Sequence, residues 1–213
     1  MKKLIIFLLI STLAFSCTVT IPMQTNLSDQ TLLLAENRNI KADYVIVSNV
    51  PDGFINYTYV YKNGTETPKN EWLKYPMETA FKKFCGNFFS AKFNDFAEDQ
   101  MQVELTLLDF EFRDQQTMGM GMTMLTGQTE NSMIANATID AIVIYHGKTY
   151  HNELKASTSE YNQSQMMSAG STYYTINQKN PTQQKAELID ACLNSGIVQF
   201  ENFLRSVIMA DKE

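Results

Sequence analysis

Residues 76–92 read PMETAFKKFCGNFFSAK and residues 101–113 read MQVELTLLDFEFR, and these two stretches decide the fold class. In the first stretch apolar residues recur every three or four positions, and a proline stands where a helix accepts one, in its first turn. The apolar stripe consists of Met77, Ala80, Phe81, Phe84, Phe88 and Ala91. A stripe this aromatic is typical of a protein core, so we predict a buried helix over residues 76–92.

The second stretch alternates between apolar and polar residues like a strand, but the alternation changes phase in the middle. One face carries Val103, Leu105 and Leu107, and the other carries Leu108, Phe110 and Phe112. A β-bulge near Leu107-Leu108 would turn both apolar sets toward one core.

The remaining elements follow from alternation and turn residues. Further strands are predicted over residues 44–47, 54–61, 133–145 and 149–158, and a polar loop over 159–182. A second helix is predicted from Thr182 to about Met209, and Gly196 in its apolar face would let another element pack closely. The expected fold is therefore α+β, with an antiparallel sheet of about four to five strands and two helices packed on one face. We expect a single α+β domain over residues 43–213.

The first sixteen residues have the layout of a signal peptide. Two lysines precede an apolar run over residues 4–13, which is too short for a membrane-spanning helix. Small residues, Ala14 and Ser16, then stand three and one positions before Cys17. Residues 1–16 are predicted to be removed after Ser16.

A cysteine at this point resembles the lipobox of bacterial lipoproteins, whose cysteine becomes the first residue and carries diacylglyceryl and palmitate chains. Two or more acyl chains hold a protein on a bilayer stably. Thr18 follows, where an aspartate would indicate inner-membrane retention, and no acidic surface-export signal is present. The resemblance implies lipidation at Cys17 and anchoring in the outer membrane, facing the periplasm. The polar residues 18–42 are predicted to be a tether, so that 17–42 comprises the lipidated cysteine and tether.

The net charge excludes one class of partner. Removing residues 1–16 takes away two lysines and no acid, which leaves 15 basic and 23 acidic residues. This balance argues against a nucleic-acid partner.

Two cysteines remain after this cleavage, Cys85 and Cys192. They either form a disulfide in an oxidising compartment or are two small buried hydrophobes.

The element order after residue 76, behind the lipobox cysteine and two short strands, resembles the YajG-like family of bacterial outer-membrane lipoproteins. More loosely, it is similar to auxiliary lipoproteins of envelope transport systems. The closest local likeness is the run Ala137-Thr138-Ile139-Asp140-Ala141-Ile142-Val143-Ile144 with its turn at Gly147, within a likeness over about residues 76–208. The resemblance implies a helix-covered sheet, a binding or scaffolding role in envelope assembly or maintenance, and no catalytic residues.

Reaction chemistry is not indicated by the sequence, which contains no phosphate-binding glycine loop, zinc-protease helix motif or nucleophile elbow. The only histidines, His146 and His151, flank a hairpin tip and are either two solvated side chains or a shared metal site. Asp109, Glu111 and Asp140 are expected on the solvent face of the sheet. We therefore predict a protein that is not an enzyme, needs no cofactor and binds a protein or lipid partner.

Four methionines, Met118, Met120, Met122 and Met124, alternate with small residues and would lie on one face of an extended chain. Three interpretations of these methionines remain open. The methionines form a core-facing strand, or a flexible apolar surface that docks a partner, or a thioether site for copper in a periplasmic metal-handling protein.

Overall fold

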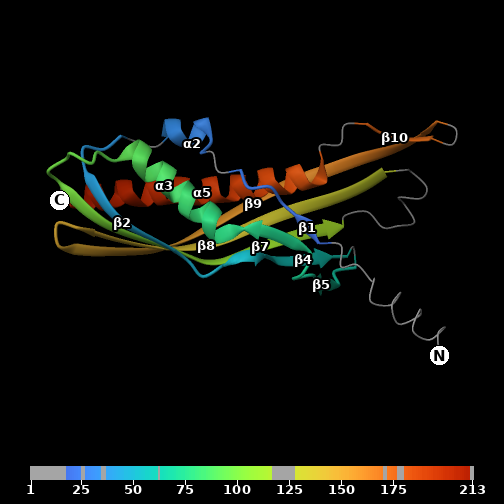
Figure 1. Ribbon diagram of the computed structural model, residues 1–213, viewed down its shortest axis with the longest axis horizontal. Coiled ribbons are helices and arrows are strands. Elements are labelled where there is room, and N and C mark those ends of the chain that lie inside the picture. Colours follow the sequence, from blue (N-terminus) through green and yellow to red (C-terminus); the bar gives the residue numbers. More distant parts are fainter. Residues whose placement is uncertain are drawn as a thin grey trace, which may run out of the picture.

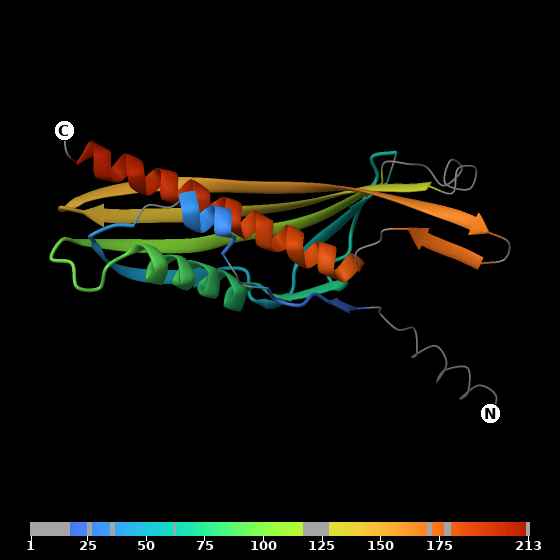
Figure 2. The ribbon, with the colours of Figure 1, turned by 90° about the horizontal axis from the view of Figure 1, so that it is seen from above.

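The computed structural model describes residues 18–24, 27–34, 37–61, 63–116, 128–169, 172–176 and 180–211. Over these residues the chain forms a seven-stranded sheet, a three-stranded sheet and three helices. Figure 1 shows a long twisted sheet with the helices lying along one side of it, and Figure 2 shows the same arrangement from above.

The seven-stranded sheet has the strand order β10-β9-β8-β7-β4-β5, and β2 also pairs with β7. Its strands are β2 (Lys41–Ser48), β4 (Asn56–Val60), β5 (Glu66–Pro68), β7 (Gln100–Gln116), β8 (Gln128–Tyr145), β9 (Lys148–Ala169) and β10 (Thr172–Ile176). The long antiparallel hairpin of β8 and β9 dominates the view in Figure 1.

The expectation of an antiparallel sheet with four to five strands is wrong, because the sheet is larger and mixed. β2 runs parallel to the first half of β7, and β4 runs parallel to its second half. The helix α3 (Met77–Lys92) lies between these strands and β7 in the chain and carries the backbone back along the sheet. A strand that follows a helical crossover pairs in parallel with the strand before it.

The bulge predicted in β7 is confirmed. The pairing of β7 with β8 shifts register between Leu107 and Asp109. Leu107 and Phe110 are both buried, so the shift keeps the apolar sets on one side. Leu108 does not reach the core as expected, since it is the residue left out of the register and is 37% exposed.

The two long helices, α3 and α5 (Pro181–Ala210), are close to their predicted bounds and cover the same side of the sheet (Figure 2). Asn180 caps α5, and its side chain accepts a hydrogen bond from the Thr182 backbone N–H at 3.0 Å. The helices meet through aromatic rings, with the centroids of Phe88 and Phe200 6.0 Å apart. A Cβ on Gly196 would lie 2.7 Å from Cδ1 of Ile139, which confirms the predicted close approach.

The described residues of the segment 18–42, which was expected to be a tether, contribute instead to the folded body. Here β1 (Val19–Thr20) pairs with β6 (Leu73–Pro76), which pairs with β3 (Asp52–Phe54), and α2 (Asp29–Leu34) follows. Ile21 and Ile40 are buried. The polar residues of the segment are used in contacts with α5, such as the 2.9 Å hydrogen bond from the Thr31 hydroxyl to Oδ1 of Asn194.

The loop expected over residues 159–182 is also corrected. The backbone of β9 continues to Ala169, and β10 pairs antiparallel with its end. Polar residues on both faces of a strand leave no apolar alternation in the sequence, so the pattern could not reveal it.

Candidate functional site

The side of the large sheet that faces away from the helices is here called the open face. Strand pairing places its side chains in rows across β2, β7, β8 and β9. Three successive rows are Asp43–Gln102–Ile144–Thr149, Val45–Glu104–Ile142–His151 and Val47–Thr106–Asp140–Glu153. The residues between them on β7 and β8, such as Val103 and Val143, point to the core.

On the open face, apolar residues of β2 and β8 flank the polar residues Gln102, Glu104 and Thr106 of β7. Val45 is 59% exposed, Val47 38% and Ile144 37%. The acidic residues of this face whose side chains the structure describes are Asp43, Glu104, Asp109, Glu111, Asp140 and Glu153. They include the three strand acids predicted to face solvent. Its basic residues are each engaged by an acid, in the pairs Lys41–Asp43 at 3.7 Å, Arg113–Glu111 at 2.9 Å and Lys155–Glu153 at 3.0 Å.

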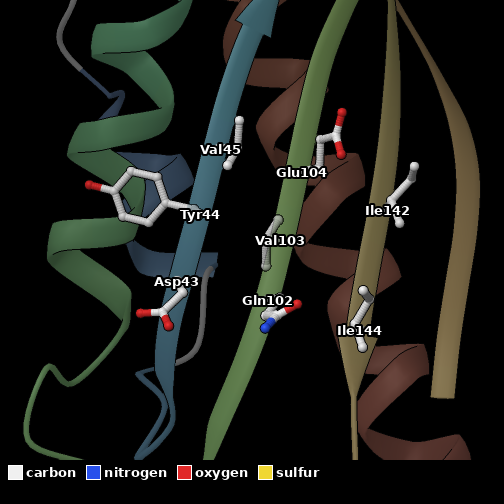
Figure 3. Close-up of a pocket in the computed structure, with 8 residues that line it drawn as sticks. All are labelled: Asp43, Tyr44, Val45, Gln102, Val103, Glu104, Ile142 and Ile144. Carbon is white, nitrogen blue, oxygen red and sulfur yellow. The ribbon is translucent and has the colours of Figure 1, made fainter. Parts of the chain in front are cut away.

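A groove with a volume of about 260 Å³ lies on the open face across β2, β7 and β8. Figure 3 shows Val45, Glu104 and Ile142 side by side across the three strands, with Gln102 and Ile144 in the next row. Tyr44 points the other way, toward α3, and its ring stacks on Phe89 with centroids 4.3 Å apart. Because neighbouring residues of a strand face opposite sides, Asp43 and Val45 of β2 then face the groove.

The edge of the sheet beside the groove is formed by β2. Within the described part of the chain, β2 pairs with β7 alone, so its other edge carries no neighbouring strand there. All eight residues of β2 are at least partly exposed. A free strand edge next to a groove can receive an added strand from a partner.

The two histidines lie in separate ion pairs rather than in one site. His146 contacts Asp211 through Nδ1 at 2.5 Å and Asp99 through Nε2 at 3.0 Å, which raises the pKa of His146 and lowers that of Asp211. The pKa of Asp99 is lowered first by the hydrogen bond that the Tyr145 hydroxyl donates to it and then by His146. His151 contacts Asp140 at 2.5 Å on the open face. The His146 cluster ties the end of α5 to the β8–β9 turn, which is a structural role.

Two further ionisable groups are largely buried. Burial raises the pKa of Asp190 on α5 to about 7, and the hydroxyl of Tyr75 donates a 3.4 Å hydrogen bond to it. Asp114 on β7 lies 3.6 Å from Nζ of Lys185. These contacts join α5 to the sheets, and none of the four residues lines the groove.

The predicted site residues fall into two groups. Cys85 and Cys192 are free, buried thiols on α3 and α5, and burial raises the pKa of Cys192 to about 12. The lipidation site Cys17 and the four methionines of residues 118–124 lie outside the described residues. The groove residues Val45, Ile142 and Ile144 were not identified from the sequence as site residues.

Among the described residues there is no group of three or more His, Cys, Asp or Glu side chains that could hold a metal ion. None of the helices in that part of the chain combines the length and apolar composition needed to cross a bilayer.

Comparison with known proteins identifies no family. No family model matches the chain, and no match is found among curated proteins. Among solved structures, it is similar to an uncharacterised protein at 10% identity, over 89% of this chain and 99% of the other, with a TM-score of 0.38. It is also similar to the protein XCC0632 from Xanthomonas campestris, of the family DUF330, at 8% identity, over 91% and 97% of the two chains, with a TM-score of 0.42.

Proposed function

We propose that this protein is a non-catalytic lipoprotein of the bacterial envelope, anchored in the outer membrane through Cys17 and facing the periplasm. On this proposal its open face binds a protein partner during envelope assembly or maintenance. The observation that carries the binding role is the groove at Val45, Glu104 and Ile142, where apolar side chains remain exposed between acidic ones.

The side chains of the groove indicate which kind of partner segment would bind there. Covering the exposed valine and isoleucine side chains with apolar side chains of a partner lowers the free energy of the complex. The surrounding carboxylates attract lysine and arginine and repel acidic segments. The free edge of β2 favours an extended chain, because such a chain can pair with the edge while alternate side chains enter the groove. The expected partner segment is therefore an extended polypeptide with alternating apolar and basic residues.

The anchor is supported by the signal-peptide layout before Cys17 and by the resemblance to YajG-like lipoproteins. Its test is a Cys17→Ala substitution in the full chain, followed by separation of membrane and soluble fractions. The wild type should incorporate a labelled fatty acid and sediment with membranes, whereas the variant should do neither. A variant that still sediments, with an unlabelled wild type, would exclude the anchor.

The binding role is tested with two synthetic peptides, one alternating leucine with lysine and one alternating leucine with glutamate. The lysine peptide should bind the wild-type protein more tightly in fluorescence anisotropy. Glu104→Lys should abolish this preference, whereas Asp95→Lys, the same charge change in an exposed turn, should retain it. Equal loss in both variants would mean that only net charge matters and that the groove is not the binding site.

A further inference from the structure

A second exposed surface surrounds the small three-stranded sheet. We call it the aromatic–lysine patch, and it consists of Phe54, Tyr61, Lys69, Trp72 and Lys74. Its three large aromatic rings are 41–44% exposed. On the open face the exposed apolar residues Val45, Val47 and Ile144 are aliphatic, and Tyr44 at the groove points toward α3, so the two surfaces differ in chemistry.

The lysines of this patch lie against its rings. Nζ of Lys69 is 3.6 Å from the ring centroid of Trp72 and 5.0 Å from that of Tyr59. Nζ of Lys74 is 4.7 Å from the ring centroid of Phe54, its cross-strand neighbour. Glu71 is an acidic residue beside the patch, whereas Glu66 is occupied by Arg113 at 3.4 Å.

This combination matches the chemistry of a membrane surface. Tryptophan and tyrosine favour the headgroup level of a bilayer, where the ring is buried and its polar atom stays hydrated. Lysine stems lie along apolar surface while the ammonium groups reach lipid phosphates. Lysines close to an anionic bilayer each add to the attraction.

The patch is also next to the proposed anchor. The backbone N–H of Val19 donates to the Trp72 carbonyl at 2.7 Å, and the N–H of Ile21 donates to the Lys74 carbonyl at 2.9 Å. The chain is therefore fixed beside Trp72 two residues after Cys17. Figures 1 and 2 place β1 in the half of the molecule away from the C-terminal end of α5.

We propose that the aromatic–lysine patch is a membrane-docking surface, which rests on anionic lipid headgroups and orients the domain on the bilayer. This inference rests on the proposed anchoring at Cys17. Because a few residues cannot reach far, an anchored Cys17 would hold the patch at the bilayer surface and leave the C-terminal end of α5 directed away from it.

Trp72 is the only tryptophan of the chain, so its fluorescence reports directly on the patch. The full-length protein is purified from membranes and reconstituted into vesicles of phosphatidylcholine and phosphatidylglycerol. Lipids brominated near the headgroup end of their acyl chains should quench Trp72, and its emission should shift to shorter wavelength. Mass spectrometry of the same sample determines whether Cys17 carries lipid.

The Lys69→Gln/Lys74→Gln double variant tests the lysines, with Lys83→Gln/Lys155→Gln as a control that removes the same charge elsewhere. In the Cys17→Ala background, the vesicle affinity should fall about fivefold for each patch lysine removed and stay unchanged in the control. Quenching without lipid on Cys17 would support docking while the anchor fails. A lipidated, vesicle-bound protein whose Trp72 is unquenched, and as accessible to iodide as in free solution, would overturn docking and leave the anchor standing.

Discussion

Arg38 and Glu201 form a buried ion pair that should hold the N-terminal segment on α5. The guanidinium donates to both carboxylate oxygens, at 2.8 and 2.6 Å, and the two side chains are 4% and 3% exposed. Arg38→Met would remove one partner and leave the other charge buried. Losing one member of a buried pair costs about 3–5 kcal/mol.

The lower end of this range applies, because Nε of Arg205 also lies 3.0 Å from Glu201 and remains after the substitution. We expect a loss of about 3 kcal/mol in the free energy of unfolding, or a decrease in Tm of about 6–12 °C for a domain of this size. The Arg38→Met/Glu201→Leu double variant should recover most of the loss, because it leaves no buried charge of the pair.

The assay is guanidinium unfolding followed by circular dichroism, with Arg113→Met as the control. Arg113 pairs with Glu111 at the surface, so its loss should cost no more than about 1 kcal/mol. An Arg38→Met protein as stable as the wild type would refute the reasoning, since the segment around Arg38 would then contribute nothing to the fold.

Three further outcomes follow from the described contacts. Phe84→Ala should cost about 3–5 kcal/mol in chemical denaturation, because the ring is fully buried, whereas Phe96→Ala, at 96% exposed, should cost almost nothing. His146 has a pKa raised above its ordinary 6.5 by Asp211 and Asp99, so its stabilising effect is present below pH 6.5 and lost as pH rises through the raised pKa. In the wild type, Tm should therefore fall as pH rises through this pKa, and His146→Gln should reduce that fall. The same dependence of Tm on pH in both proteins would contradict the contacts of His146 with Asp211 and Asp99. A thiol assay on the unfolded, unreduced protein should detect both buried thiols of α3 and α5, whereas detecting neither would indicate a disulfide.

Local patterns in the sequence were sufficient for the elements that depend on local periodicity. The aromatic stripe of residues 76–92 defined α3, and the phase change near Leu107 located the bulge in β7. The parallel pairing of β2 with β7 was missed by the expectation of an antiparallel sheet, because the direction of pairing depends on which strands become neighbours.

The N-terminal segment and the groove required tertiary information. Arg38 and Thr31 look like tether residues in the sequence, because their partners on α5 are far away in the chain. Val45 and Ile142 become one surface only through the registers of β2 with β7 and of β7 with β8. Composition does not specify either register.

The central claim is that a partner covers the open face in the envelope, and cysteine labelling of Val45→Cys tests it most directly. The control is Phe96→Cys, an exposed position in the turn before β7. Cys85 and Cys192 are buried, and Cys17 is expected to be blocked by lipid. In purified protein a maleimide reagent should label both positions at similar rates. In permeabilised cells at native expression, Val45→Cys should be protected at least severalfold while Phe96→Cys is labelled as before. Equal labelling of the two positions in cells would contradict a partner on the open face.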